Sequence, residues 1–163
     1  MKNSSLLLHF RDILILPFTV TVVIPYFIGP QFVTGYALFK ISGIALGLVG
    51  LTMFLYTVFL FRTIGKGTLA PWTIKQKLVV AGPYLYCRNP MITGVLFILA
   101  GEALFFHSTN LLIWAATFFA INMVYFIAFE EPDLEEKFGE EYRVYKRHVP
   151  RWLPRLKPFE LKQ

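Results

Sequence analysis

Four long apolar runs constrain this chain more than any other feature of its sequence. They cover residues 13–29, 41–61, 91–106 and 111–129. Each is close to the roughly 20 apolar residues with which a helix crosses the hydrocarbon layer of a membrane, where the backbone must satisfy its own hydrogen bonds. The chain is 56% hydrophobic and only 16% charged, outside the usual balance of a soluble domain. The sequence therefore predicts an all-α membrane protein with about four transmembrane helices in a single domain, residues 1–163.

Features inside and between the runs refine this prediction. The first run contains Pro17 and Pro25 but no small-residue cleavage site, so we expect a membrane anchor and not a signal peptide. In the second run, Gly43 and Gly47 have the spacing of small residues at helix contacts, which favours close packing between neighbouring helices over dimerisation. Only residues 107–110 separate the third and fourth runs. These two runs should form a tight helical hairpin.

Basic residues outside the runs predict the orientation. Five of them lie between the second and third runs and eight follow residue 130, whereas the turn at 107–110 has none. Lys and Arg gather on the cytoplasmic side, so both termini and the middle loop are expected there. The net charge of +6 then belongs to one membrane face, and no basic soluble domain exists to bind nucleic acid. We expect a prokaryotic inner membrane, with the endoplasmic reticulum as the eukaryotic counterpart.

The middle loop, residues 62–89, is longer than loops in compact proteins usually are without a purpose. Its glycines and prolines permit close backbone approach to a ligand. They are Gly65, Gly67, Pro71, Gly82 and Pro83. The alternative is an interfacial segment anchored by Trp72. Composition alone leaves both interpretations open.

The tail after residue 129 changes abruptly from apolar to densely charged. Pro132 suits the first turn of a helix, acidic residues lie early, and basic residues lie late, in agreement with the helix dipole. Apolar residues recur at helical spacing, which predicts an amphipathic helix that packs on the bundle or lies in the membrane interface. They are Leu134, Phe138, Tyr142 and Tyr145.

Acidic groups near the membrane need a physical explanation. Glu130 and Glu131 end an apolar helix at the surface, where they are either solvated or bind a cation such as an ammonium group. Glu102 lies deeper, in the third run, and should find a partner inside the bundle. A structural hydrogen bond is the favoured interpretation. The candidate partners are Asn122, Arg62 and Arg88.

Other site types find little support in the sequence. Cys87 is the only cysteine, which excludes an internal disulfide, and we interpret it as a reduced bystander. No nucleotide-binding glycine motif is present, and no histidines or cysteines have the spacing of metal ligands. We expect no metal site.

Two segments together carry a resemblance to a known superfamily. The segment "LVVAGPYLYCRNPMITG" at 78–94 and the segment "EEPDLEEKFGEEYRVYKRHVPRWLP" at 130–154 resemble the isoprenylcysteine carboxyl methyltransferases and phospholipid methyltransferases. Those are integral membrane enzymes that use S-adenosylmethionine. The matching positions are Leu78, Val79, Gly82, Tyr84, Arg88, Asn89, Pro90, Gly94, Glu130, Glu131, Phe138, Gly139, Tyr142, Tyr145, Val149 and Pro150.

The resemblance implies a site built from two cofactor elements, residues 65–94 and 130–154. Arg88 and Tyr142 are the implied catalytic candidates, with Arg88 pairing the cofactor carboxylate or orienting an acidic substrate. The alternative for Arg88 is a purely structural arginine that snorkels at the membrane edge. Glu130 would hold the methionine end of S-adenosylmethionine, because its ammonium is the cation that this carboxylate needs. The cofactor would be bound by Gln76, Lys77, Leu78, Val79, Gly82, Tyr84, Asn89, Pro90, Met91, Ile92, Glu130 and Glu131.

The methyl acceptor is expected to be a lipid or small amphiphile that enters from the bilayer. Where prenylcysteine enzymes have an arginine, this chain has Phe126, and Asn89 replaces their histidine. These departures bring the chain closer to the phospholipid enzymes, although Ile92 replaces their usual tyrosine. Carboxylate and amine acceptors both remain open. An NADPH-dependent membrane reductase and a non-enzymatic membrane partner protein are the two alternatives.

Overall fold

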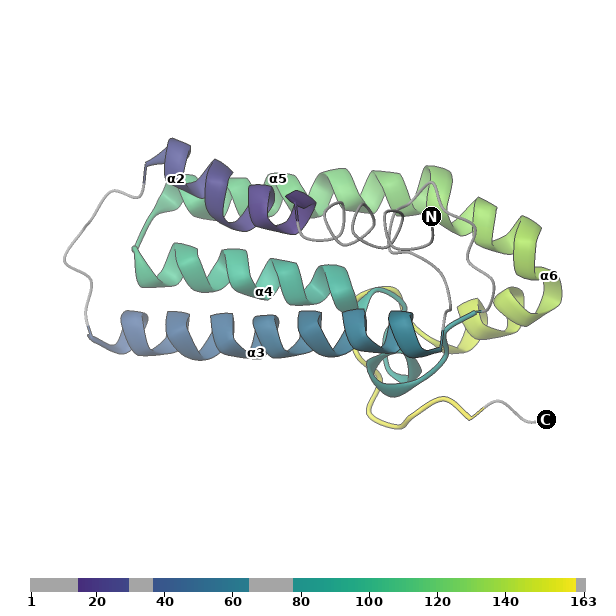
Figure 1. Cartoon of the computed structure of the whole chain (residues 1–163). Coiled ribbons are helices and arrows are strands. Elements are labelled where there is room, and N and C mark those ends of the chain that lie inside the picture. The colour runs from purple at the N-terminus through teal and green to yellow at the C-terminus, as the bar shows by residue number, and fades with distance from the viewer. Residues whose placement is uncertain (1–14, 30–36, 65–77, 161–163) are drawn as a thin grey trace, which may run out of the picture.

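The computed structural model describes residues 15–29, 37–64 and 78–160 (Figure 1). All regular structure in these ranges is helical, which confirms the all-α prediction. The N-terminal helix Ile15–Ile28 contains a π-helical segment, η1 (Thr19–Val23), followed by α2 (Ile24–Ile28). The other elements are α3 (Ala37–Thr63), the short 3₁₀ helix η2 (Gly82–Leu85), α4 (Pro90–Phe105), α5 (Thr109–Tyr125), the π-helical η3 (Phe126–Glu130) and α6 (Glu131–His148).

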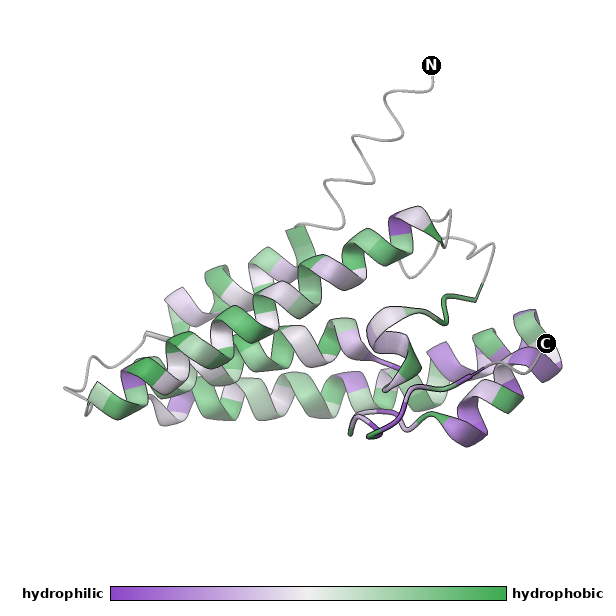
Figure 2. Cartoon of the chain, turned by 90° about the horizontal axis from the view of Figure 1, so that it is seen from below, coloured by the Kyte–Doolittle hydropathy of each residue, from purple (hydrophilic) through white to green (hydrophobic). Residues whose placement is uncertain are grey.

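The helices form an elongated bundle in which α4 lies between α3 and α5 (Figure 1). Its core contains Phe54 from α3, Val95 and Leu99 from α4, and Ala115 and Phe118 from α5. Many large apolar side chains on the outside of α3 and α5 are exposed. Figure 2 shows these helices as largely hydrophobic, whereas hydrophilic residues gather on α6 and the tail at one end. This distribution suits a bundle surrounded by lipid with one polar end.

Two helices within the described residues are long and apolar enough to cross a membrane. They are α3 and the continuous helical run Thr109–His148, while Ile15–Ile28 and Pro90–Phe105 are apolar but shorter. Each predicted run thus corresponds to a helix. The hairpin at 107–110 is confirmed: α4 ends at Phe105, and Ser108 caps α5 by accepting a hydrogen bond from the backbone N–H of Leu111 at 3.4 Å.

Contrary to the sequence interpretation, the helix of the fourth run does not end at Glu130 and Glu131. Helix α5 continues without a break through η3 into α6, so the apolar helix and the amphipathic helix are continuous as far as Gly139. The π-helical turn ends at Glu130, two residues before Pro132, and such local widening lets a helix accommodate a proline that lacks a backbone N–H. The sequence suggested a helix end because the composition changes there from apolar to charged. A change in composition does not show whether the backbone continues as a helix.

Glycines hold α3 and α4 in close contact. A Cβ atom on Gly43 would lie 2.6 Å from the carbonyl oxygen of Gly101, and one on Gly50 would lie 2.5 Å from the carbonyl oxygen of Gly94. The backbone of Gly47 lies 2.8 Å from the position of a Cβ on Gly101, although a Cβ on Gly47 itself would have open space. The prediction of close helix packing at Gly43 and Gly47 is therefore confirmed.

Helix α6 bends sharply at Gly139, which has φ 55° and ψ −126°. The second half of α6 returns toward the bundle, as Figure 1 shows at the end opposite the hairpin. The apolar residues of both halves, Leu134 and Phe138 before the bend and Tyr142 and Tyr145 after it, join one cluster. The prediction of one apolar face is confirmed, but the sequence analysis did not foresee the bend.

We expect Gly139→Ala to lower the free energy of unfolding by about 1–3 kcal/mol, because only glycine adopts these dihedral angles without strain. A Cβ at Gly139 would meet no atom within 4 Å, so the cost is purely conformational. Thermal unfolding in detergent, followed by circular dichroism, measures it. Gly47→Ala is the matched control, since it lies in regular helix with open space and should be neutral or stabilising. Equal stability of the two variants would contradict the strain.

Candidate functional site

The middle segment and the tail are joined through their backbones at the polar end of the bundle. The N–H of Arg88 donates to the carbonyl of Pro150 at 2.9 Å, and the N–H of Asn89 donates to that of Arg151 at 3.3 Å. Farther out, the N–H groups of Arg155 and Phe159 donate to the carbonyls of Tyr86 and Leu85, both at 3.0 Å. The two segments that carry the superfamily resemblance therefore form one unit, directly before the first turn of α4.

A buried aromatic cluster fills the space between these segments. Tyr142, Tyr145 and Phe159 are at most 7% exposed and pack with Leu78 and Val80 of the middle segment. The hydroxyl of Tyr145 donates to the carbonyl oxygen of Tyr84 at 2.7 Å. Burial raises the pKa of Tyr145, so its hydroxyl stays protonated and remains a donor at neutral pH. This bond fixes the backbone of the predicted adenosine-binding segment to α6.

Glu131 lies at the centre of a charged cluster with three cations. Its Oε1 lies 3.0 Å from the Nη1 of Arg88 and 2.6 Å from the Nε of Arg151, and its Oε2 lies 3.2 Å from the Nζ of Lys146. Lys146 also pairs with Glu135. Although burial raises the pKa of Glu131, hydrogen bonds from Arg151 and the charge of Arg88 outweigh it and leave the pKa below its usual value. Glu131 is therefore ionised, and both of its carboxylate oxygens are paired with cations.

Arg88 joins this cluster to the aromatic one. Besides Glu131, its Nη1 donates to the hydroxyl of Tyr142 at 3.4 Å. Burial, and to a smaller extent the charge of Glu131, raise the pKa of Tyr142, so this hydroxyl also stays neutral. The Nε–H of Arg88 is buried and has no acceptor among the residues that the structure describes. A buried guanidinium donor without an acceptor is costly, and an anionic ligand group would satisfy it.

Glu130 occupies a different environment from Glu131. It is half-buried, and its Oε2 accepts a hydrogen bond from the hydroxyl of Tyr125 at 3.4 Å. Its charge contributes to the raised pKa of Tyr84, after the larger effects of burial and of Tyr145 and Cys87. Glu130 is therefore close enough to Tyr84 to act on it electrostatically. These are the two residues that the resemblance assigned to opposite ends of the cofactor.

The remaining predicted site residues have mixed surroundings. Val79 and Tyr84 are buried together against Leu60 of α3, while Leu78 packs on the tail cluster. Gly82 has φ 55°, and a Cβ there would lie 2.8 Å from the Cδ1 of Leu60. The other predicted positions form two groups. Asn89 directly precedes α4, and the first turn of α4 contains Pro90, Met91 and Ile92. The side chains of Met91 and Ile92 pack on the bundle core. Gln76 and Lys77 lie outside the described residues.

Sequence reasoning missed Lys146, Arg151 and Trp152. Arg151 and Lys146 neutralise Glu131, and the indole N–H of Trp152 donates to the Sδ of Met123 at 3.3 Å while its ring packs on Phe126. A signal existed, because a carboxylate at a membrane surface needs cations and the tail is rich in them. The sequence alone, however, does not identify which of the eight basic residues of the tail reaches the Glu131 carboxylate.

Two other residues singled out by the sequence take no part in this cluster. Cys87 is 3% exposed, and burial raises its pKa to about 11, so the thiol is protonated at neutral pH, in agreement with an unreactive bystander. Within the described residues, the hydrogen bond expected between Glu102 and one of its three candidate partners is not formed. The amide of Asn122 donates to the carbonyl of Phe118, Arg88 pairs with Glu131, and Arg62 lies in the last turn of α3. No cluster of metal-ligating residues occurs in the described ranges.

Comparison with known families agrees with this arrangement. A family model described as phospholipid methyltransferase matches residues 39–141, well over half of the chain. Neither a curated protein nor a solved structure matches the chain. The match begins near the start of α3 and ends inside α6. It contains the whole of the first predicted cofactor segment, residues 65–94, and the first half of the second, residues 130–154. The chain therefore belongs to the phospholipid methyltransferase family, and with its exposed apolar helices this membership supports a membrane-associated methyltransferase.

Proposed function

We propose that this protein is a four-span membrane enzyme that transfers a methyl group from S-adenosylmethionine to a lipid or another small amphiphile. The observation that carries the proposal is the joining of the middle segment to the tail, which brings Tyr84, Arg88 and Glu130 to one end of the bundle. The family match supports methyl transfer and favours it over the reductase alternative and over a non-enzymatic membrane partner.

The charges at this end fit the methionine part of the cofactor. The buried Nε–H of Arg88 is a donor for a carboxylate, and Glu130 is an acceptor for an ammonium group. Glu131 already has three cationic partners, so we assign it to the support of Arg88 and Arg151 and assign the ammonium to Glu130. This proposal differs from the sequence interpretation, which gave both carboxylates a direct role in cofactor binding.

The surrounding residues would enclose the rest of the site. Leu78, Val79, Gly82 and Tyr84 would line the adenosine, with Gln76 and Lys77 extending that wall. Asn89, Pro90, Met91 and Ile92 would continue it, with Asn89 and the backbone before α4 nearest to the cofactor because the side chains of Met91 and Ile92 turn to the core. Tyr142 would position Arg88 through the hydrogen bond at 3.4 Å.

The chemistry needs alignment more than a strong acid or base. When bound, S-adenosylmethionine supplies a methyl group on a positively charged sulfur, which a nucleophile attacks in line. A carboxylate acceptor requires no base, whereas an amine must be neutral at the moment of attack. The protein therefore contributes mainly by orienting the reactants and excluding water. Asn89 and Phe126, which differ from the prenylcysteine enzymes, favour a phospholipid-like acceptor.

The proposed topology follows from the same arrangement. The helices Ile15–Ile28, α3, α4 and α5 would cross the membrane, with both termini, the middle loop and α6 in the cytoplasm. This places the polar end of Figure 2 in water, where a soluble cofactor can reach it. A prokaryotic inner membrane is the proposed location, and the bilayer supplies the acceptor.

We expect Glu130→Gln to weaken binding of S-adenosylmethionine by roughly tenfold to a hundredfold, the usual loss for one charged hydrogen bond of about 1.5–3 kcal/mol. Calorimetric titration of the detergent-solubilised protein measures the affinity. Transfer of an isotopically labelled methyl group to a lipid extract should fall in parallel. Glu136→Gln is the control, because Glu136 is an exposed carboxylate on the same helix.

Two outcomes would count against the proposal. Unchanged affinity in Glu130→Gln would remove Glu130 from the site, and absence of binding heat in the unaltered protein would overturn the use of this cofactor. Stabilisation by NADPH in place of S-adenosylmethionine would favour a reductase.

A further inference from the structure

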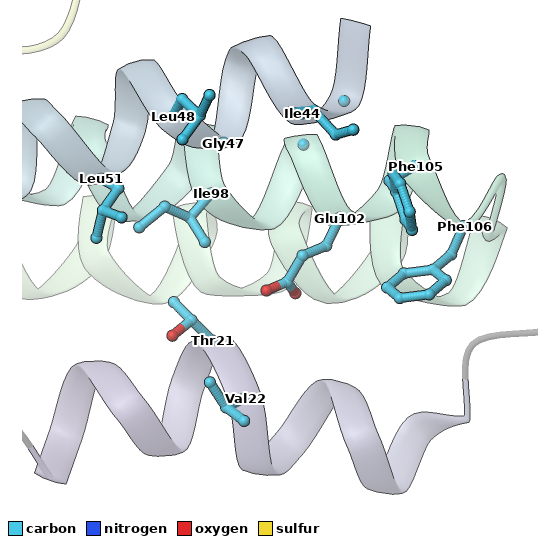
Figure 3. Close-up of a pocket in the computed structure, with 12 residues that line it drawn as sticks. Thr21, Val22, Ile44, Gly47, Leu48, Leu51, Ile98, Glu102, Phe105 and Phe106 are labelled. Carbon is cyan, nitrogen blue, oxygen red and sulfur yellow. The ribbon is translucent and has the colours of Figure 1, made fainter. Parts of the chain in front are cut away.

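A cavity lies in the half of the bundle farthest from the proposed cofactor site. It has a volume of about 350 Å³ and lies between the N-terminal helix, α3 and α4. Figure 3 shows the Glu102 carboxylate entering it from α4 toward Thr21 and Val22. The rest of its lining is apolar or glycine and includes Leu48, Leu51 and Ile98. A mostly apolar cavity with one polar group is the usual form of a small-molecule site.

Glu102 has an unsatisfied carboxylate oxygen in this cavity, as far as the described residues show. Its Oε2 is buried and accepts no hydrogen bond from the residues described. Thr21, the nearest polar side chain in Figure 3, donates its hydroxyl proton to the carbonyl of Pro17 at 2.8 Å. Lys40 and His107, at the same end of the bundle, are exposed and do not line the cavity. Glu102 as a whole is partly exposed, but a carboxylate oxygen buried among apolar residues is costly unless a cation or donor reaches it.

We infer that this cavity binds the ammonium group of a single-chain amphiphilic amine. The ammonium would pair with Glu102, and the alkyl chain would lie against Leu48, Leu51 and Ile98. The volume is at the lower end of the range for ligand cavities, which suits one chain. An aminophospholipid fits less well, because its phosphate would lie near Glu102 and no described lining residue carries a positive charge.

This site is separate from the proposed methyl-transfer site. Glu102 lies twelve residues beyond Pro90 on α4, a distance of about 18 Å along the helix axis at about 1.5 Å per residue. An amine bound there is too far from the first turn of α4 to receive a methyl group at that end. The inference therefore does not depend on the proposed function, and failure of cofactor binding would leave it intact.

The test compares dodecylamine with dodecanol, which has the same chain but no charge. In maltoside detergent near neutral pH, dodecylamine should stabilise the unaltered protein against thermal unfolding in a saturable way, with at least tenfold higher affinity than dodecanol. Glu102→Gln should remove this preference and leave dodecanol binding unchanged. Glu136→Gln, which alters an exposed carboxylate, should behave like the unaltered protein.

A second variant tests the volume of the cavity and not its charge. Gly47 lines the cavity, and a Cβ there would meet no atom within 4 Å, so Gly47→Leu should fill it and weaken both probes. Equal affinity for amine and alcohol in the unaltered protein would overturn the inference even if Glu102→Gln fails to fold. Amine binding that survives in both variants would do the same. Tighter binding of lysophosphatidylethanolamine than of dodecylamine would refute the choice of an amine without a phosphate.

Discussion

Glu131→Ala should lower the free energy of unfolding by about 3 kcal/mol and cause the largest loss of stability from any single charge removal in the described chain. The Glu131 side chain is 6% exposed and is the shared partner of Arg88, Lys146 and Arg151. Removing one member of a buried ion pair typically costs about 3–5 kcal/mol, because the other charge remains buried without compensation. We place the effect at the lower end because the Lys146 side chain is 36% exposed.

The chain offers a matched control for this variant on the same helix. Glu140 also pairs with two arginines, Arg143 and Arg147, each at 3.0 Å, but its side chain is 64% exposed. Exposed ion pairs contribute at most about 1 kcal/mol, so Glu140→Ala should have a small effect. Chemical unfolding in detergent, followed by near-ultraviolet circular dichroism of the tail tyrosines, measures both variants. Similar losses in the two would show that the Glu131 cluster is no more than a surface network.

The same cluster predicts how stability depends on pH. The pKa of Glu131 is lower in the folded protein than its ordinary value of 4.5. The unfolded chain therefore binds a proton more readily, and the stabilisation is complete above pH 4.5 and is lost as the pH falls through the folded pKa. In Glu131→Gln, the free energy of unfolding should therefore fall less steeply as the pH is lowered. The same decrease at low pH in the variant and the unaltered protein would exclude Glu131 as the cause of this pH dependence.

Gly50→Ala should destabilise the helix pair α3 and α4 by about 1–3 kcal/mol, and by more if the helices separate. The added Cβ would lie 2.5 Å from the carbonyl oxygen of Gly94 and 2.8 Å from the backbone nitrogen of Ile98. These atoms belong to the backbone of α4, so no side chain can rotate to relieve the overlap and the helices must move apart. The loss exceeds the gain of up to about 1 kcal/mol from replacing a helical glycine by alanine.

Gly47→Ala, three residues earlier on the same helix, separates packing from helix propensity. Its Cβ would meet no atom within 4 Å, so it should show only the gain in propensity. The comparison uses thermal unfolding of both variants in the same detergent. Because α4 carries Asn89 and the first turn next to the proposed site, Gly50→Ala should also reduce cofactor affinity. Equal stability of the two alanine variants would contradict the close approach of α3 and α4.

Much of the architecture follows from the sequence because its causes are local. Each apolar run became a helix, since apolar residues in a membrane leave the backbone no other way to satisfy its hydrogen bonds. The glycine spacing at Gly43 and Gly47 indicated the helix contact, and the turn at 107–110 fixed the hairpin. The apolar face of α6 was visible because its period of about 3.6 residues survives even across the bend at Gly139.

The sequence by itself thus determined the helical class, the bundle and the family resemblance, which depend on composition, periodicity and spacing. Only the tertiary structure decided the charge pairing. It showed that Glu131 pairs with Arg88, Lys146 and Arg151. It also showed that, among the described residues, the Arg88 Nε–H finds no acceptor and the Glu102 Oε2 finds no donor. The bend at Gly139 and the fold-back of the tail bring Glu131 and its three cations within a few ångströms, although they are separated by tens of residues in the sequence. Because electrostatic partners are selected by distance in space, no linear pattern could have assigned them.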